Sequence, residues 1–157
     1  MELCSIASGS SGNCICAGTQ NCHLMIDAGI SGKRIEAGLN SVGLKTEEME
    51  GILITHEHSD HIKGLGVISR KYGIPIYTTG GTADAMLRMK SLGKMPEGLI
   101  HEIREDEPFG IKDLTVNPFT ISHDAAQPVG YRLECGEHSV GIATDPVSYT
   151  HLRAHET

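Results

Sequence analysis

Tryptophan is absent from the 157-residue chain, and the other aromatic residues are scarce, with two Phe and four Tyr. Cysteine is also sparse: five residues, an odd number, exclude a disulfide-rich scaffold and fit a reducing compartment. Long apolar runs are missing too, so we expect neither a membrane-spanning helix nor an export signal. These absences predict a cytoplasmic protein that does not enter the membrane.

Basic residues are fewer than acidic ones, 13 against 20, and the formal net charge is −7. An acidic chain repels polyanions, so the charge argues against a general affinity for DNA unless something local reverses its sign. Two bound divalent cations would do so at one place. The charge therefore predicts that a nucleic acid would bind weakly away from such cations.

The chain is rich in glycine, with 19 residues, and 39% of it is apolar, which is typical of one turn-rich globular domain. Strand-like and helix-like segments alternate up to residue 93, and strands follow, which predicts a layered α/β (or α+β) domain with helices packed on a sheet. We expect strands at 2–7, 13–18, 23–27, 51–55, 75–79, 99–103, 114–122, 129–135 and 139–144, and helices at 31–42, 62–72 and 82–92.

The densest group of reactive side chains follows the expected strand 51–55, where THEHSDH contains His56, His58, Asp60 and His61. In an extended segment residues 56 and 58 project to the same side, so two imidazoles can converge on one ion while Asp60 and His61 are directed elsewhere. The pattern predicts two adjacent metal sites. The alternative is that Asp60 caps the next helix and the histidines are solvated, but three histidines at a strand end contribute little to packing.

This run resembles the His-x-His-x-Asp-His motif of the metallo-β-lactamase superfamily, whose hydrolases form an αββα sandwich and bind two metal ions, usually zinc. Other segments are similar to the YycJ/WalJ branch of that superfamily: SIASGSSGNC at 5–14, LMIDAG at 24–29, ITHEHSDHIKGL at 54–65, ISHDA at 121–125 and PVGYRLECGEHSVGIATD at 128–145. The resemblance spans residues 1–145, and it implies the first half of the sandwich plus part of the second.

The resemblance also implies the site residues. The first metal would be held by His56, His58 and His123, the second by Asp60 and His61, and Asp145 would bridge both; Asp60 and Asp145 are the implied catalytic carboxylates, and Asp27 would accept a hydrogen bond that holds the ligands in place. A carboxylate that closes a buried strand has to be paired, protonated or metal-bound. For Asp145 this argument agrees with the metal-binding role that the resemblance implies. Plain turn roles for Asp27 and Asp145, and an exposed ion pair of His123 with Asp124, stay open.

Two further groups have competing interpretations. Cys14, Cys16 and Cys22 with His23 could form a zinc knuckle, although alternate cysteines on a strand more often are small buried residues. The turn SGSSGN at 8–13 suits a hairpin, and its amides could also cradle a phosphate. We expect His23, His101 and His138 to lie outside the metal site.

The segment 146–157, PVSYTHLRAHET, departs from the pattern of the family. We therefore expect an incomplete metallo-β-lactamase-like domain at 1–145 and an artefactual tail at 146–157, without the residues that complete the second metal site. Such a partial sandwich is expected to leave an apolar sheet face uncovered and to aggregate or self-associate.

The resemblance implies a binuclear metal-dependent hydrolase, with zinc or manganese as cofactor, that cuts nucleic-acid phosphodiesters, in particular DNA, as an exonuclease. A hydrolase of small esters, thioesters or lactones on the same two metals is the alternative within enzymes. The alternative outside enzymes is an inactive fragment that binds at most one metal ion.

Overall fold

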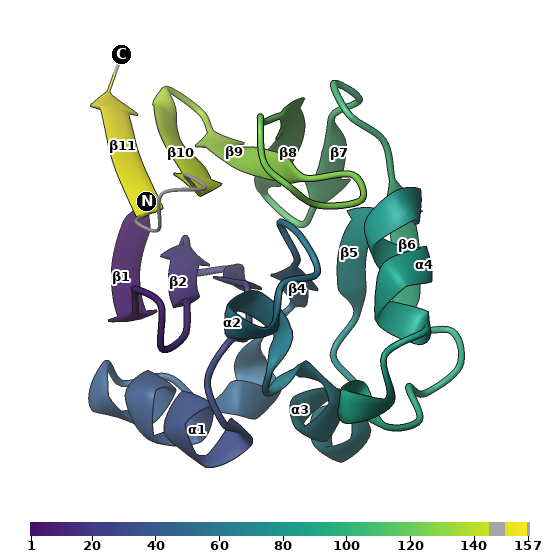
Figure 1. The fold of residues 1–157 in the computed structure, drawn as a ribbon. Coiled ribbons are helices and arrows are strands. Elements are labelled where there is room, and N and C mark those ends of the chain that lie inside the picture. Colours follow the sequence, from purple (N-terminus) through teal and green to yellow (C-terminus); the bar gives the residue numbers. More distant parts are fainter. Residues whose placement is uncertain (145–149, 157) are drawn as a thin grey trace.

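The computed structural model describes residues 1–144 and 150–156, and in it two β-sheets stack on one another (Figure 1). The first sheet has six strands in the order β1-β2-β3-β4-β5-β6: β1 (Glu2–Ala7), β2 (Cys14–Gly18), β3 (His23–Ile26), β4 (Gly51–Leu53), β5 (Ile76–Thr79) and β6 (Ile100–Ile103). Strands β1 to β3 pair antiparallel, and β3 to β6 pair parallel. The carboxyl ends of β3, β4 and β5 therefore meet at one edge, where ligands bind in sheets of this kind.

Helices cover the face of the first sheet that points away from the second sheet (Figure 1). They are α1 (Gly32–Ser41), α2 (Ser59–Ile62), α3 (Leu65–Tyr72) and α4 (Gly80–Leu87), with 3-10 turns η1 (Thr46–Glu48) and η2 (Lys90–Leu92). Ser31 caps α1 by accepting a hydrogen bond from the Arg34 amide, and Ile35 and Leu39 of this helix are fully buried. None of the helices in the described part of the chain is long and apolar enough to cross a membrane.

The second sheet is antiparallel and pairs in the order β11-β10-β9-β8-β7. Its strands are β7 (Phe109–Ile111), β8 (Leu114–Thr120), β9 (Val129–Cys135), β10 (His138–Thr144) and β11 (Thr150–Glu156). Val116, Tyr131 and Leu133 point from it toward Leu24, Ile26 and Leu53 of the first sheet and form the core between the two sheets. Tyr131 also donates a hydrogen bond of 2.7 Å to the carbonyl of Ile54, which fastens the second sheet to the end of β4.

The expected α/β layered fold is confirmed, and the main corrections concern helix ends and short strands. The expected helix 62–72 divides at Gly64, where a Cβ would lie 2.1 Å from the Ile30 carbonyl oxygen. The expected helix 82–92 starts at residue 80, because the Thr79 hydroxyl caps it, and it ends before Met89, whose backbone is extended. The strands β7 and β11 were not expected.

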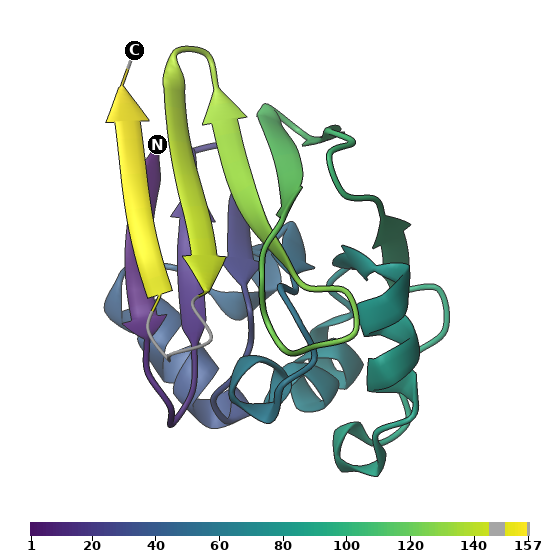
Figure 2. The same cartoon turned by 45° about the horizontal axis from the view of Figure 1, so that its top comes forward.

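The expectation of an uncovered apolar sheet face is wrong for the described side chains. Figure 2 shows no helix of the described chain on the outer face of the second sheet. That face carries mainly polar or small residues, among them Thr115, Asn117, Arg132, Glu134 and Gly141, with the half-buried Phe119 as an apolar exception, because most apolar residues alternate inward. The large apolar side chains that are exposed are Val42, Val67 and Leu87, all on the helical side.

Candidate metal centre

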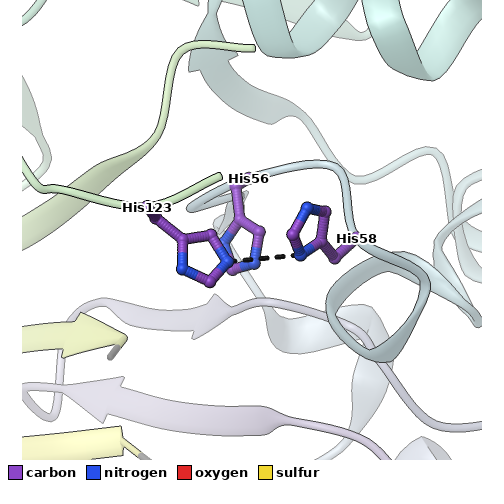
Figure 3. A group of neighbouring side chains, drawn as sticks. All are labelled: His56, His58 and His123. Atoms are coloured by element: carbon purple, nitrogen blue, oxygen red, sulfur yellow. Dashed lines mark hydrogen bonds between the residues drawn. The ribbon is translucent and has the colours of Figure 1, made fainter. Parts of the chain in front are cut away.

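Three histidines converge at the carboxyl end of β4. His56 and His58 belong to the segment after β4, and His123 comes from the loop after β8, so the first and the second sheet both contribute (Figure 3). One ring nitrogen from each of the three lies within 4.8 Å of the others. His123 Nε2 is 3.2 Å from His58 Nδ1, close to the ~3.3 Å between two nitrogens that share a tetrahedral zinc ion.

His56 is the most buried member of this cluster, 1% exposed, and its Nε2 atom has no hydrogen-bond partner among the described residues. Burial, with the neighbouring His61, His123 and His58, lowers the pKa of His56 to about 2. Burial and the rings of His58 and His61 also lower the pKa of His123. Neutral imidazoles with an unused lone pair are what a divalent metal requires, so the donor set fits a metal ion. No other such group is found among the described residues.

Asp60 and His61 lie on α2 beside the three-histidine cluster but outside it. The His61 ring centroid is 4.1 Å from that of His56, and His61 Nε2 is 3.6 Å from Asp60 Oδ2. Burial lowers the pKa of His61 and the Asp27 carboxylate raises it, and the net direction is upward. The two side chains thus present a nitrogen and a carboxylate oxygen close together, as a second metal position would need. Asp145, the expected bridge, lies outside the described residues.

Asp27 follows β3 and is buried, with a left-handed backbone of φ 63° that is uncommon for a residue other than glycine. Its carboxylate accepts three hydrogen bonds: Oδ1 from the Thr55 amide at 2.8 Å, and Oδ2 from the Thr55 hydroxyl at 2.8 Å and from His61 Nδ1 at 2.6 Å. Because His61 uses its Nδ1 proton for Asp27, its lone pair is on Nε2. Through these contacts Asp27 joins β3 to Thr55 and to His61; its role in holding metal ligands stays a prediction.

Thr55 extends this arrangement to His56 and was missed in the sequence. Its hydroxyl gives its only proton to Asp27 and lies 2.9 Å from His56 Nδ1, so it accepts the proton of that nitrogen. The lone pair of the His56 ring is therefore also on Nε2. Thr55 is the residue directly before His56, and its residue type alone does not predict a hydrogen bond to the ring of His56.

Asn13, the last residue of the SGSSGN turn, was also missed. Its amide nitrogen Nδ2 lies 3.3 Å from both Asp60 Oδ2 and His61 Nε2, and its backbone amide donates to the Asp60 carbonyl at 2.7 Å. Gly29 faces the same carbonyl so closely that a Cβ there would lie 1.8 Å from it. The turn closes the expected hairpin of β1 and β2. Through the contacts of Asn13 with Asp60 it also holds the short helix α2 in place.

Glu57 connects the two loops that carry the histidines. Its carboxylate accepts a hydrogen bond from the Ala126 amide, at 3.0 Å to Oε2, three residues after His123. Gln127 fastens the same loop on its other side: its side-chain oxygen accepts from the Gly81 amide at 2.8 Å, and its side-chain nitrogen donates to Glu105 at 2.6 Å. His123 therefore sits on a loop that is held by the segment after β4, by α4 and by the connection between β6 and β7.

The remaining candidates lie away from the centre. Cys14 and Cys16 are buried among the helices, and Cys22 is buried between the sheets, so the structure favours small core residues over a zinc knuckle. Burial raises the pKa of Cys16 to about 12, which opposes a thiolate. His101 stacks on Tyr77, and neither it nor His23 nor His138 belongs to the histidine cluster.

The two-sheet fold and the histidine cluster define a metallo-β-lactamase type of domain. The family described as "Beta-lactamase superfamily domain" matches residues 23–156, and the chain belongs to it. The chain is 42% identical over 142 residues to the exodeoxyribonuclease YycJ of Bacillus anthracis and 43% identical to the exodeoxyribonuclease WalJ of Streptococcus pneumoniae. Each match covers 89% of this chain and 52% of the relative, so the chain spans about half the length of these curated relatives.

The expected resemblance to the YycJ/WalJ branch is thereby confirmed. Among solved structures, a B3 metallo-β-lactamase with an active-site glutamic acid superposes with a TM-score of 0.75 at 16% identity, over 93% of this chain and 61% of that one. At this identity the likeness shows the fold alone. The fold implies divalent metal ions, and the described residues supply one cluster suited to hold them.

Proposed function

We propose that the intact protein is a metal-dependent hydrolase that cuts phosphodiester bonds of nucleic acid, with DNA as substrate and exonucleolytic cleavage as its mode. The observation that carries the proposal is the neutral ring of His56 inside a three-histidine cluster, whose buried Nε2 finds no hydrogen-bond partner in the described part of the chain. The names of the relatives, exodeoxyribonucleases, support the substrate class.

The proposed centre holds two divalent ions, zinc or manganese. His56, His58 and His123 would hold the first ion and Asp60 and His61 the second, and Asp145 would serve both. Ions bound there would polarise the phosphoryl oxygen and acidify the attacking water. Asp27 and Thr55 fix the tautomers of His61 and His56, so that both rings present Nε2 to the ions. Asp60, whose side chain is 35% exposed, is proposed to act as catalytic carboxylate together with Asp145.

The test combines metal analysis with substrate profiling. The protein is loaded with Zn²⁺ or Mn²⁺, its metal content is measured by mass spectrometry, and it is given end-labelled single-stranded DNA, duplex DNA, RNA and a chromogenic ester. We expect stepwise shortening of DNA that stops when a chelator removes the metal. Cleavage of the ester alone would instead favour the small-substrate alternative, and one bound ion without hydrolysis would favour the inactive fragment.

A further inference from the structure

Charge is divided unevenly along this acidic chain. Residues 61–95 contain six basic side chains and one acidic side chain, Asp84, whereas the rest of the chain contains seven basic and 19 acidic ones. The six basic residues are all exposed: Lys63, Arg70, Lys71, Arg88, Lys90 and Lys94. This segment begins at His61 of the metal motif, so the positive charge starts beside the proposed centre.

One contact brings two of these basic residues, Arg70 and Lys94, together beside α3. Val67 and Arg70 of α3 are three residues apart, which puts them on one side of that helix, and Val67 is 51% exposed; Lys63 lies just before the break at Gly64. The Arg70 guanidinium donates to the carbonyls of Leu92 at 2.7 Å and Lys94 at 3.1 Å. This bond joins the segment after η2 to α3 and fixes the position of the Arg70 charge.

The first residues of α1 lie next to α3. A Cβ on Gly32 would lie 2.9 Å from the Val67 side chain, so α1 begins directly beside α3. The next two residues, Lys33 and Arg34, are exposed. Nearby Glu36 is engaged by Lys71 at 2.7 Å, and these two charges offset one another. We call five of the other cations, Lys33, Arg34, Lys63, Arg70 and Lys94, the basic face; Arg88 at the end of α4 and Lys90 in η2 are not counted in it.

A hollow of about 350 Å³ lies on the basic face, lined by Arg70, Lys94, Met95, Pro96 and Glu97. Arg70 uses one of its nitrogens for the two carbonyls and keeps other N–H donors. Beside the apolar Met95 and Pro96, the lining holds two cations and one carboxylate, that of Glu97. The two cations suit a phosphate group with its attached sugar and base, since phosphates account for much of the affinity of proteins for nucleic acid, and Glu97 offsets part of their charge.

We propose that the basic face binds the phosphodiester backbone of a nucleic-acid strand whose end lies at the metal centre. The inference rests on the proposed function and adds a binding surface to it. Such a surface gives an acidic protein an attraction for DNA that does not depend on the metal ions, contrary to the weak binding that the net charge alone predicts.

The test measures binding without cleavage. Binding of fluorescent oligothymidylate to the full chain is followed by fluorescence anisotropy in a chelator at a series of NaCl concentrations. The face variant carries Lys33→Gln, Lys63→Gln and Lys94→Gln. The control variant carries Lys45→Gln, Arg104→Gln and Arg132→Gln, three exposed cations off the basic face, and it changes the net charge by the same amount.

We expect the face variant to lose at least about tenfold in affinity and its salt slope to fall by roughly 2, since each lost phosphate contact on a single strand removes about 0.7. The control variant should stay within about twofold of the unmodified chain. Equal losses in both variants, no binding by the unmodified chain, or equally tight binding of polyglutamate would overturn the proposal.

A second measurement separates this inference from the proposed function. Hydrolysis of bis(4-nitrophenyl) phosphate, which is too small to reach the basic face, should be unchanged in the face variant when metal is present, while its KM for DNA should rise. Binding through the face without any hydrolysis would refute the proposed function and leave the inference standing. Metal-dependent DNA cleavage with the same KM in all three proteins would refute the inference alone.

Discussion

The Thr55 hydroxyl lies 2.9 Å from His56 Nδ1 and donates its own proton to Asp27. The hydroxyl must therefore accept the proton of Nδ1, which leaves Nε2 of His56 with its lone pair toward the other histidines. The same carboxylate accepts from His61. One buried anion thus sets the tautomer of a ring in each proposed metal position, directly for His61 and through Thr55 for His56.

Thr55→Val should weaken metal binding by about 10- to 100-fold, because the isosteric side chain leaves His56 Nδ1 without its acceptor and releases the tautomer. Thr78→Val is the matched control: Thr78 is also fully buried and donates to the Ile54 carbonyl, but it touches no imidazole. Both variants should lose about 1–3 kcal/mol of unfolding free energy. Competition with a chromogenic chelator measures the metal affinity, and equal affinities in the two variants would refute the tautomer argument.

The convergence of His56 and His58 could be predicted from the sequence because the information for it is local. His56 and His58 stand two apart in an extended segment, and this spacing alone brings their rings to one side. His123 could be added to the predicted cluster only through the family resemblance, since 65 residues separate it from His58. Its place in the cluster depends on the packing of the second sheet on the first, which no local pattern encodes.

The supporting residues escaped prediction for the same reason. Asn13, Thr55 and Glu57 are ordinary turn or loop residues by type, and their partners become neighbours only in the folded chain. The short strand β7 has three residues, too few for an alternating pattern to stand out. The largely polar outer face of the second sheet was likewise not anticipated, because the expected apolar surface followed from the resemblance to a two-half sandwich and not from the side chains of β8 and β9.

His58→Ala should lower the bound metal and abolish hydrolysis, because it removes one of three neutral nitrogen ligands of the first position. Cys16→Ser should leave the metal content unchanged, since Cys16 lies in the core on the helical side of the sheet. Metal content after gel filtration, with circular dichroism to verify folding, distinguishes the two. A His58→Ala protein with unchanged metal and turnover would remove His58 from the ligand set.

Gly29→Ala should destabilise the protein by about 1–3 kcal/mol or more, because its Cβ would lie 1.8 Å from the Asp60 carbonyl oxygen and α2 would have to move. Gly141→Ala, where a Cβ meets nothing within 4 Å, should stay close to the unmodified protein. Urea unfolding gives the free energies. Since α2 carries Asp60 and His61, we also expect the Gly29 variant to bind fewer metal ions at saturation, and full occupancy would show that α2 tolerates the shift.

Asp145→Asn should reduce turnover by orders of magnitude while the fold survives, because the bridging carboxylate implied by the resemblance would set both the metal spacing and the basicity of the attacking water. Turnover of bis(4-nitrophenyl) phosphate at saturating metal measures the effect, and the circular dichroism spectrum monitors the fold. Near-normal turnover would assign Asp145 to an ordinary turn before Pro146.

Glu57→Ala should weaken metal binding about tenfold, because the Ala126 amide loses its acceptor and the loop that carries His123 is no longer held to the His56 segment. Glu57→Gln keeps an oxygen that can accept this hydrogen bond and should restore most of the affinity. Glu97 is an exposed glutamate on the loop after η2, and Glu97→Ala should have no effect.

The decisive measurement is a double-mutant cycle read by the absorption spectrum of bound Co²⁺. If Glu57 acts by positioning His123, then Glu57→Ala changes neither the affinity nor the spectrum once His123→Ala is present. Additive losses in the double variant would mean that Glu57 supports the metal centre by a route independent of His123.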